Sequence, residues 1–148
     1  MNFTNFYPFI LLFYDNFLAN LVFLPSLKEY ALATMLINKK YNLQLLYLIT
    51  IISTTIANIV NYQIGIILAN YGQGKLRLSK NQLLKYQIFT YIILPFNIIS
   101  IIGESISVVA GFVRSRFAPF LVITIIIRII LYYLLIFKNI NFDFLEKF

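Results

Sequence analysis

The most constraining feature of this sequence is an apolar run from Phe117 to Phe137 that contains a single charge, Arg128. A helix needs about 20 predominantly apolar residues to cross the hydrocarbon core of a bilayer. A second run, Leu43–Ala69, is long enough to cross with some tilt. Apolar types make up 61% of the 148 residues and charged types only 11%, too few for the polar surface of a soluble domain. The sequence therefore predicts an all-α integral membrane protein.

The residue types that the chain lacks exclude several classes of function. Cysteine and histidine are both absent, so a disulfide, a thiol nucleophile, an imidazole base and a Cys/His metal site cannot be built. We therefore expect no enzymatic activity, no metal and no cofactor. The net charge of +7 does not point to nucleic acid, because the basic residues lie in gaps between apolar runs, where we expect them to face anionic lipid headgroups.

Two further apolar stretches are interrupted, unlike a plain spanning helix. In the first, Phe3–Leu24 leads into the polar segment Pro25–Glu29 and then into Tyr30–Ile37, which is too short to span. Irregular backbone at membrane depth is tolerated only where it is buried in protein or faces water. We therefore expect a re-entrant helical hairpin at about residues 16–38, which enters and leaves the membrane on the same side.

The second interrupted stretch runs from Ile88 to Val113. Polar and helix-breaking residues divide it: Pro95, Asn97, Gly103 and Glu104. By the same argument we expect a second re-entrant hairpin at about residues 86–113. The sequence thus predicts one domain, residues 1–148, with these parts in order: hairpin 16–38, transmembrane helix 43–69, basic loop 70–85, hairpin 86–113 and transmembrane helix 117–137.

The two halves of the chain resemble each other. Glu29 and Glu104 are each followed ten residues later by a basic residue, Lys39 or Arg114. An apolar run follows in each half, with the similar strings LITII from residue 48 and VITII from residue 122. One spanning helix separates the copies, so they should have opposite orientations. Inverted repeats with broken helices are typical of transporters.

We single out three charged residues that the two expected hairpins and the last apolar run place in hydrocarbon: Glu29, Glu104 and Arg128. A charge at mid-bilayer costs about 2.5–3.5 kcal/mol on insertion scales, so each needs a partner or a water-filled cavity. We predict that they form a transport site, which a desolvated glutamate could couple to protons. The alternatives are a surface loop for Glu29, an interface between two short helices for Glu104, and a structural salt bridge for Arg128.

Small and polar residues recur at steps of three and four along the run 43–69, on one helical face: Thr50, Thr54, Asn58, Asn61 and Gly65. This polar face is either a wall of the transport site or a surface for close helix packing. Two basic residues, Arg114 and Arg116, follow the second hairpin. They either guide a lipid phosphate inward or are loop residues on the cytoplasmic side.

Three segments carry a resemblance to a known family: Leu24–Leu32 (LPSLKEYAL), Asn61–Gly65 (NYQIG), and the series Gly103-Glu104, Val109–Arg114, Pro119 and Arg128. In order and spacing they resemble motifs of the DedA family, also called the VTT or SNARE-associated domain, and especially its short YqaA-like branch. The resemblance covers nearly the whole chain. The chain departs from the branch at several positions: Ser26 for Gly, Ser53-Thr54 for Gly-Asn, Ile66 for Arg, Glu104 for Asp, Arg128 for Lys and Leu131 for Arg.

The resemblance implies two re-entrant hairpins in an inverted repeat and a multi-pass location in the bacterial inner (plasma) membrane. It implies envelope homeostasis through movement of lipids, phospholipid or undecaprenyl phosphate, with Glu29 and Glu104 as embedded acids and Arg114 and Arg128 as basic partners. The missing arginines at 66 and 131 weaken the expected phosphate site. We expect a lipid or lipid-phosphate transporter (flippase or scramblase). Coupling to protons and formation of a homo-oligomer are both compatible with this expectation. The alternative is a non-transporting structural or accessory subunit of a membrane complex.

Overall fold

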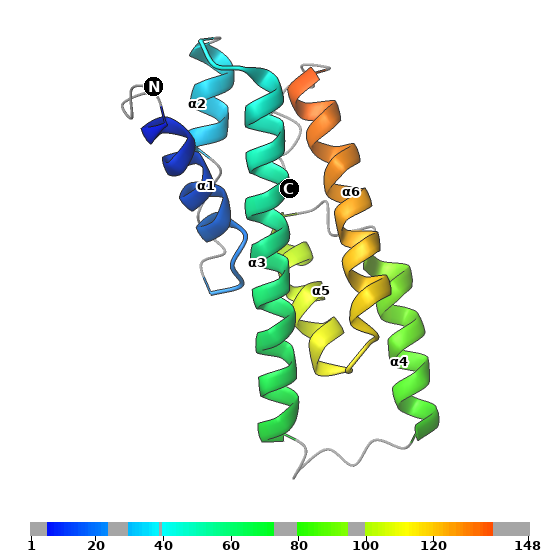
Figure 1. Ribbon diagram of the computed structural model, residues 1–148. Coiled ribbons are helices and arrows are strands. Elements are labelled where there is room, and N and C mark those ends of the chain that lie inside the picture. The colour runs from blue at the N-terminus through cyan, green and yellow to red at the C-terminus, as the bar shows by residue number, and fades with distance from the viewer. Residues whose placement is uncertain (1–5, 24–29, 39, 73–79, 95–99, 138–148) are drawn as a thin grey trace.

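The computed structural model describes residues 6–23, 30–38, 40–72, 80–94 and 100–137, apart from the side chains of 72, 80–83 and 100–103. Six helices form within these ranges: α1 (Tyr7–Ala19), α2 (Tyr30–Asn38), α3 (Leu43–Gly72), α4 (Lys80–Ile93), α5 (Ser100–Phe112) and α6 (Phe117–Phe137). All regular secondary structure in the described part is helical, which confirms the predicted fold class at that level (Figure 1).

The two longest helices, α3 and α6, are long and apolar enough to cross a membrane, and they coincide with the two predicted transmembrane helices. They have 30 and 21 residues, a rise of about 45 and 32 Å. Because α3 continues to Gly72 and α4 begins at Lys80, helix occupies both ends of the predicted basic loop 70–85. Residues 80–85 contain Lys, Gln and Leu but no Gly or Pro, and such residues favour helix.

The other helices are arranged around α3, which contacts α1, α2, α5 and α6. Figure 1 shows α1 and α2 beside the first half of α3, and α5 beside its second half with α4 next to it. In each pair the two short helices run in opposite directions. The pairs differ in their neighbours, however, because α1 packs on the long helix of its own half, whereas α5 packs far more extensively on α3 than on α6. The halves do not pack alike, and the inverted repeat stays a prediction.

The interruption of the second apolar stretch agrees with the prediction only in part. Gly103 and Glu104 are inside α5, not in a break between helices, so that part of the prediction is wrong. A single glycine in a helix costs only about 1 kcal/mol, whereas the residue before a proline is driven out of helical geometry. Pro95 accordingly lies between α4 and α5, in the segment 95–99 that is outside the described residues. The predicted break at Pro25–Glu29 also lies outside them.

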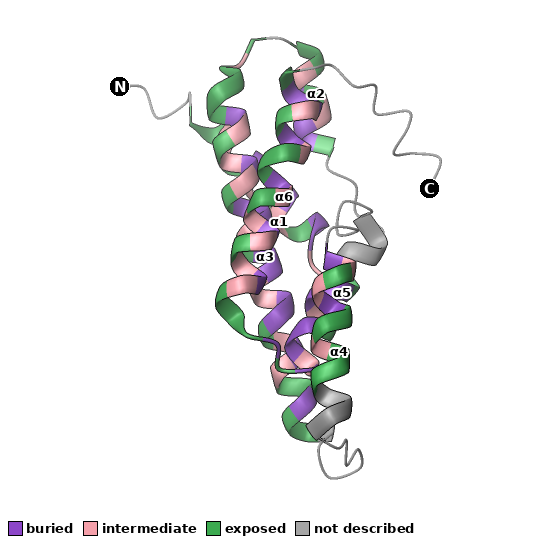
Figure 2. Cartoon of the chain, turned by 90° about the vertical axis from the view of Figure 1, so that its right-hand side faces the viewer, coloured by how far each residue is buried: buried purple, intermediate pink, exposed green. Residues whose placement is uncertain are grey.

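The core contains two apolar clusters at different levels along α3, and buried residues lie on the sides of the helices that face their neighbours (Figure 2). The first cluster joins α1, α2, α3 and α6: Leu12, Ala31, Leu32, Met35, Leu46, Tyr132, Leu135 and Ile136. The second joins the other end of α3 and α6 to α4 and α5: Tyr62, Leu94, Ile106, Ala110 and Phe120.

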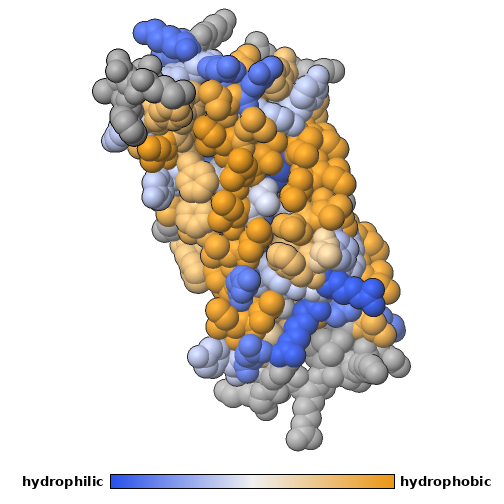
Figure 3. Space-filling model, in the orientation of Figure 1, coloured by the Kyte–Doolittle hydropathy of each residue, from blue (hydrophilic) through white to orange (hydrophobic). Residues whose placement is uncertain are grey.

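Large apolar side chains are exposed over much of the outer surface, on α3 (Leu48, Ile52), α4 (Phe89) and α6 (Ile126, Ile130). Figure 3 shows hydrophobic side chains over the middle of one face and hydrophilic ones towards its two ends. A water-soluble protein has the opposite distribution, since broad exposed apolar patches and many buried polar groups are both unusual in it.

Candidate functional site

Buried polar side chains gather between the two apolar clusters. On α3, the positions between Leu46 of the first cluster and Tyr62 of the second include five buried polar residues. On α6, two buried polar residues lie between Tyr132 and Phe120 in the same way. Together with buried residues of α1, its C-terminal turn and α5 they form a group that we term the polar layer: Asn16, Asn20, Thr50, Ser53, Thr54, Asn58, Asn61, Glu104, Ser107, Thr124 and Arg128.

Two contacts fix the level of Arg128 along the molecule. The hydroxyl of Tyr47 donates a hydrogen bond to the carbonyl oxygen of Ile129 at 3.1 Å. Further along, the rings of Tyr62 and Phe120 stack with their centroids 4.8 Å apart. Because α6 runs antiparallel to α3 (Figure 1), Thr124 and Arg128 lie between these contacts, level with the polar stretch of α3. Arg128 is 4% exposed although it is near the middle of the most apolar run in the chain.

Helix α5 brings Glu104 to a similar level. The hydroxyl of Ser107 donates to Oδ1 of Asn58 at 2.8 Å, which places the first half of α5 against the middle of α3. Glu104 precedes Ser107 by three residues, so it lies on the same face of α5, one turn nearer the start of that helix. It is 1% exposed. The predicted acid of the second half is therefore buried in the layer that also contains Arg128.

The end of α1 is tied to the polar layer by amide side chains. Asn16 Nδ2 donates to Oγ1 of Thr50 at 3.1 Å. Asn61 uses both the nitrogen and the oxygen of its side-chain amide. Its Nδ2 donates to the carbonyl oxygen of Asn20 at 2.8 Å, and its Oδ1 accepts from the backbone N–H of Val22 at 3.1 Å. These bonds satisfy backbone groups where the chain leaves α1, which is the condition for irregular backbone in an apolar environment.

Several atoms of the layer retain bonding capacity. Among the described residues, Nε of Arg128, Oγ1 of Thr124 and Oδ1 of Asn16 are buried without a hydrogen-bond partner. An unsatisfied buried donor or acceptor costs about 1–3 kcal/mol, more when it is charged. Such groups are satisfied when water or a polar ligand enters. A guanidinium suits phosphate or carboxylate because its planar donors match two oxygens at once.

Arg114 and Arg116 lie outside the polar layer, both exposed, at the turn between α5 and α6. Backbone bonds from Arg114 N to Gly111 O (2.9 Å) and from Ser115 N to Ala110 O (3.0 Å) close α5 as a Schellman motif. Arg114 has φ 53° at the position where glycine is usual. Its guanidinium donates to Oδ1 of Asn70 at 2.6 Å.

Side chains of α3 and α4 hold this turn. The hydroxyl of Tyr62 donates to Ser115 O at 2.6 Å, and Gln87 Nε2 donates to Val113 O and Arg114 O at 3.2 and 3.1 Å. The two exposed arginines thus project from a turn whose backbone is held by several hydrogen bonds.

The structure thus brings together six of the residues predicted from sequence, all buried in the polar layer: Thr50, Thr54, Asn58, Asn61, Glu104 and Arg128. It leaves Arg114 and Arg116 at one end, and Glu29 lies outside the described residues. Sequence reasoning did not assign Asn16 or Thr124 to the site. Both interrupt apolar runs, Asn16 next to Asp15 and Thr124 four residues, one helical turn, before Arg128, and could have been found on that ground.

Comparisons with protein-family models, with curated proteins and with solved structures give no match. The chemistry of the polar layer is therefore the basis for assigning a function.

Proposed function

We propose that the chain is a DedA-like protein of the bacterial inner membrane that moves a lipid or lipid phosphate across the bilayer. The observation that carries this proposal is the burial of Glu104 and Arg128 in one polar layer, halfway along two helices long enough to span. Ionisable groups kept at that depth are expensive, and in membrane proteins they mark pathways for ions or polar groups.

The lengths of the short helices support re-entrant hairpins. With 13 or 14 residues, α1, α4 and α5 rise only about 20 Å, less than the hydrocarbon core of about 30 Å. In a bilayer, a pair of such helices that enters from one face must return to it. The α1–α2 and α4–α5 pairs lie beside opposite halves of α3, as hairpins entering from opposite faces would (Figure 1).

The polar layer supplies what a lipid headgroup needs in order to cross. Arg128 offers a planar donor set for a phosphate, and the hydroxyl of Thr124 lies one turn away on the same helix face. Amides and hydroxyls of α3 replace part of the headgroup's hydration, while the lipid chains remain in hydrocarbon. Glu104 is the group we assign to proton exchange, with Glu29 as its counterpart in the first half.

The test is lipid translocation in liposomes that contain the purified protein and a fluorescent phospholipid. Arg128→Ala removes a charged hydrogen bond to the headgroup, which should raise the barrier to translocation by about 1.5–3 kcal/mol. The variant should therefore translocate lipid about tenfold more slowly, or slower still. The matched control is Lys85→Ala, which removes the same charge from an exposed position on α4 and should leave the rate unchanged. Equal rates for the wild type and Arg128→Ala would contradict the proposal.

One observation favours the alternative, a structural subunit without transport activity. The amides of Asn58 and Asn61 are bonded within the chain, to Ser107 and to the end of α1, as a surface for helix packing would be. In that case a partner protein should co-purify at fixed stoichiometry, and Glu104→Gln should leave both the complex and the lipid translocation rate unchanged.

A further inference from the structure

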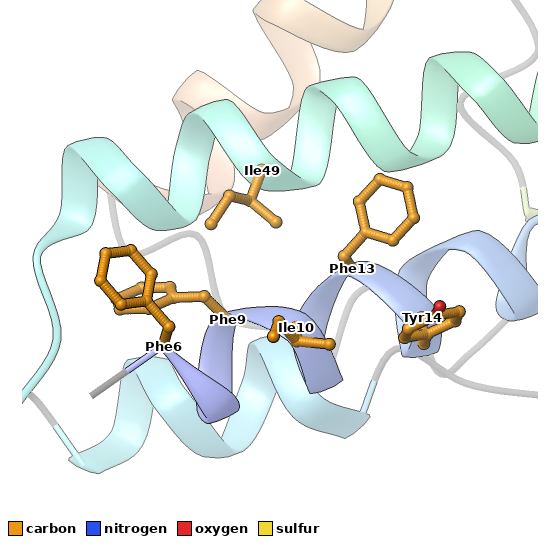
Figure 4. Close-up of a pocket in the computed structure, with 6 residues that line it drawn as sticks. All are labelled: Phe6, Phe9, Ile10, Phe13, Tyr14 and Ile49. Atoms are coloured by element: carbon orange, nitrogen blue, oxygen red, sulfur yellow. The ribbon is translucent and has the colours of Figure 1, made fainter. Parts of the chain in front are cut away.

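An apolar groove opens on the outer surface between α1 and α3, with a volume of about 610 Å³. Figure 4 shows its lining side chains, which come from the residue before α1, from α1 itself and from one position of α3: Phe6, Phe9, Ile10, Phe13, Tyr14 and Ile49. Phe6, Ile10 and Tyr14 are exposed, so the groove is open to the surroundings along its length. From Phe6 to Phe13 the groove follows about 11 Å of helix.

The shape and chemistry of the groove fit a single hydrocarbon chain. If the protein spans a membrane, as proposed above, this face meets lipid, and an unfilled apolar concavity would forfeit dispersion contacts along its walls. A protein partner is a poorer fit, because a stable protein interface buries about 1,200–2,000 Å² and needs a much broader surface.

A basic residue lies near one end of the groove. The ring of Phe9 packs edge-on against Tyr41, with centroids 5.9 Å apart, and Tyr41 follows the exposed Lys40 in the turn between α2 and α3. Lys40 precedes α3 by three residues, and α1 and α3 begin at the same end of the molecule (Figure 1). A lysine at the membrane surface attracts anionic headgroups.

From these features we infer that the groove binds one hydrocarbon chain of an anionic membrane lipid whose headgroup lies at Lys40. This inference rests on the membrane location in the proposed function but not on transport. The groove is separate from the polar layer, although the two adjoin, since Ile49 of the groove precedes Thr50 of the layer. A lipid bound here lies beside the helix whose far end is tied to that layer.

The chain contains no tryptophan, so a single introduced Trp reports on its local lipid. We would place the Trp in the groove with Phe13→Trp and, as a control, on the exposed outer face of α6 with Ile126→Trp. Each variant is reconstituted into phosphatidylcholine nanodiscs with a small fraction of chain-brominated phosphatidylglycerol or chain-brominated phosphatidylcholine, which quench Trp on contact.

At Phe13→Trp we expect phosphatidylglycerol to be preferred about fivefold, the effect of about 1 kcal/mol from one lysine near the surface. At Ile126→Trp the two lipids should quench equally. Adding Lys40→Gln to Phe13→Trp should abolish the preference. If Phe13→Trp does not fold, Tyr14→Trp reports on the same groove.

Two outcomes would overturn the inference, and they differ in what else they imply. Equal quenching by the two lipids in the groove, or the same preference at both positions, leaves the protein in the membrane without a lipid site. Absence of quenching by either lipid at either position also overturns the membrane location itself.

Discussion

Helix α3 holds α1 and α5 by different kinds of contact. The end of α1 is held by side chains, through the bonds from Asn16 to Thr50 and from Asn61 to the backbone of residues 20 and 22. Helix α5 is held by backbone packing, because Gly65 and Gly111 leave no room for a Cβ: one on Gly65 would overlap the backbone of residues 108–112, and one on Gly111 would overlap Tyr62 O.

The difference determines how each contact can change. Hydrogen bonds between helices in membrane proteins contribute about 0.6 kcal/mol on average, and water or another polar group can replace them one at a time. Close backbone packing at small residues cannot be replaced one contact at a time, because any separation of the two helices loses many dispersion contacts together. We therefore expect the α3–α5 pair to act as the fixed part of the molecule and the α1–α2 pair as the part that yields first.

The largest effect should come from adding one methyl group to the α3–α5 contact. Gly65→Ala places a Cβ into the backbone of α5, which cannot yield as a side chain can, so we expect a loss of about 3 kcal/mol in unfolding free energy. SDS titration in mixed micelles measures this. Gln63→Ala, at an exposed position of the same helix, is the control. A loss as small as that of the control would remove the basis of the comparison.

A smaller effect is expected on the α1 side. Asn61→Leu keeps the side-chain size but leaves Val22 N and Asn20 O without their bonds to Asn61, which should cost about 1–2 kcal/mol. Because the chain has no cysteine, a single Phe23→Cys probe can report on this end of α1. Its labelling by a maleimide should accelerate in the Asn61→Leu background and stay unchanged in the Gln63→Leu background. Unchanged labelling in both would mean that Asn61 does not hold α1.

The turn after α5 tests whether backbone conformation at the end of this helix affects stability. Arg114→Gly and Arg114→Ala both lose the bond to Asn70, but only alanine keeps the cost of a left-handed residue at φ 53°. We expect the glycine variant to be more stable than the alanine variant by about 1 kcal/mol. Unfolding measured side by side tests this difference, and equal stability would mean that the turn carries no such strain.

The smallest effect should come from the side-chain bond within the α3–α5 contact. Ser107→Ala removes its bond to Asn58, and we expect a loss of about 0.6 kcal/mol, since the glycine contact holds the two helices without it. A double-mutant cycle with Asn58→Ala isolates the coupling energy. A coupling of 2 kcal/mol or more would contradict the distinction between the two sides of α3.

Hydropathy was sufficient to place the long helices, because the bilayer-length runs at 43–69 and 117–137 leave few alternatives for an apolar backbone that must bond to itself. The spacing of Thr54, Asn58 and Asn61 likewise indicated a shared helix face, and all three are buried. Of the residues predicted to divide the second apolar stretch, Gly103 and Glu104 lie inside α5, because a single glycine does not end a helix. Only proline both lacks an N–H and clashes with the preceding turn.

The sequence by itself determined the two long helices and where polar residues interrupt the apolar runs, since both follow from backbone bonding and side-chain periodicity within one segment. Only the tertiary structure decided which polar groups meet. Asn58 bonds to Ser107 rather than to α6, and Asn61 bonds to the end of α1, because those pairs depend on how helices distant in sequence cross. The crossing depends in turn on where Gly65 and Gly111 let two backbones approach. This approach cannot be read from either segment alone, because it needs one glycine from each of two helices.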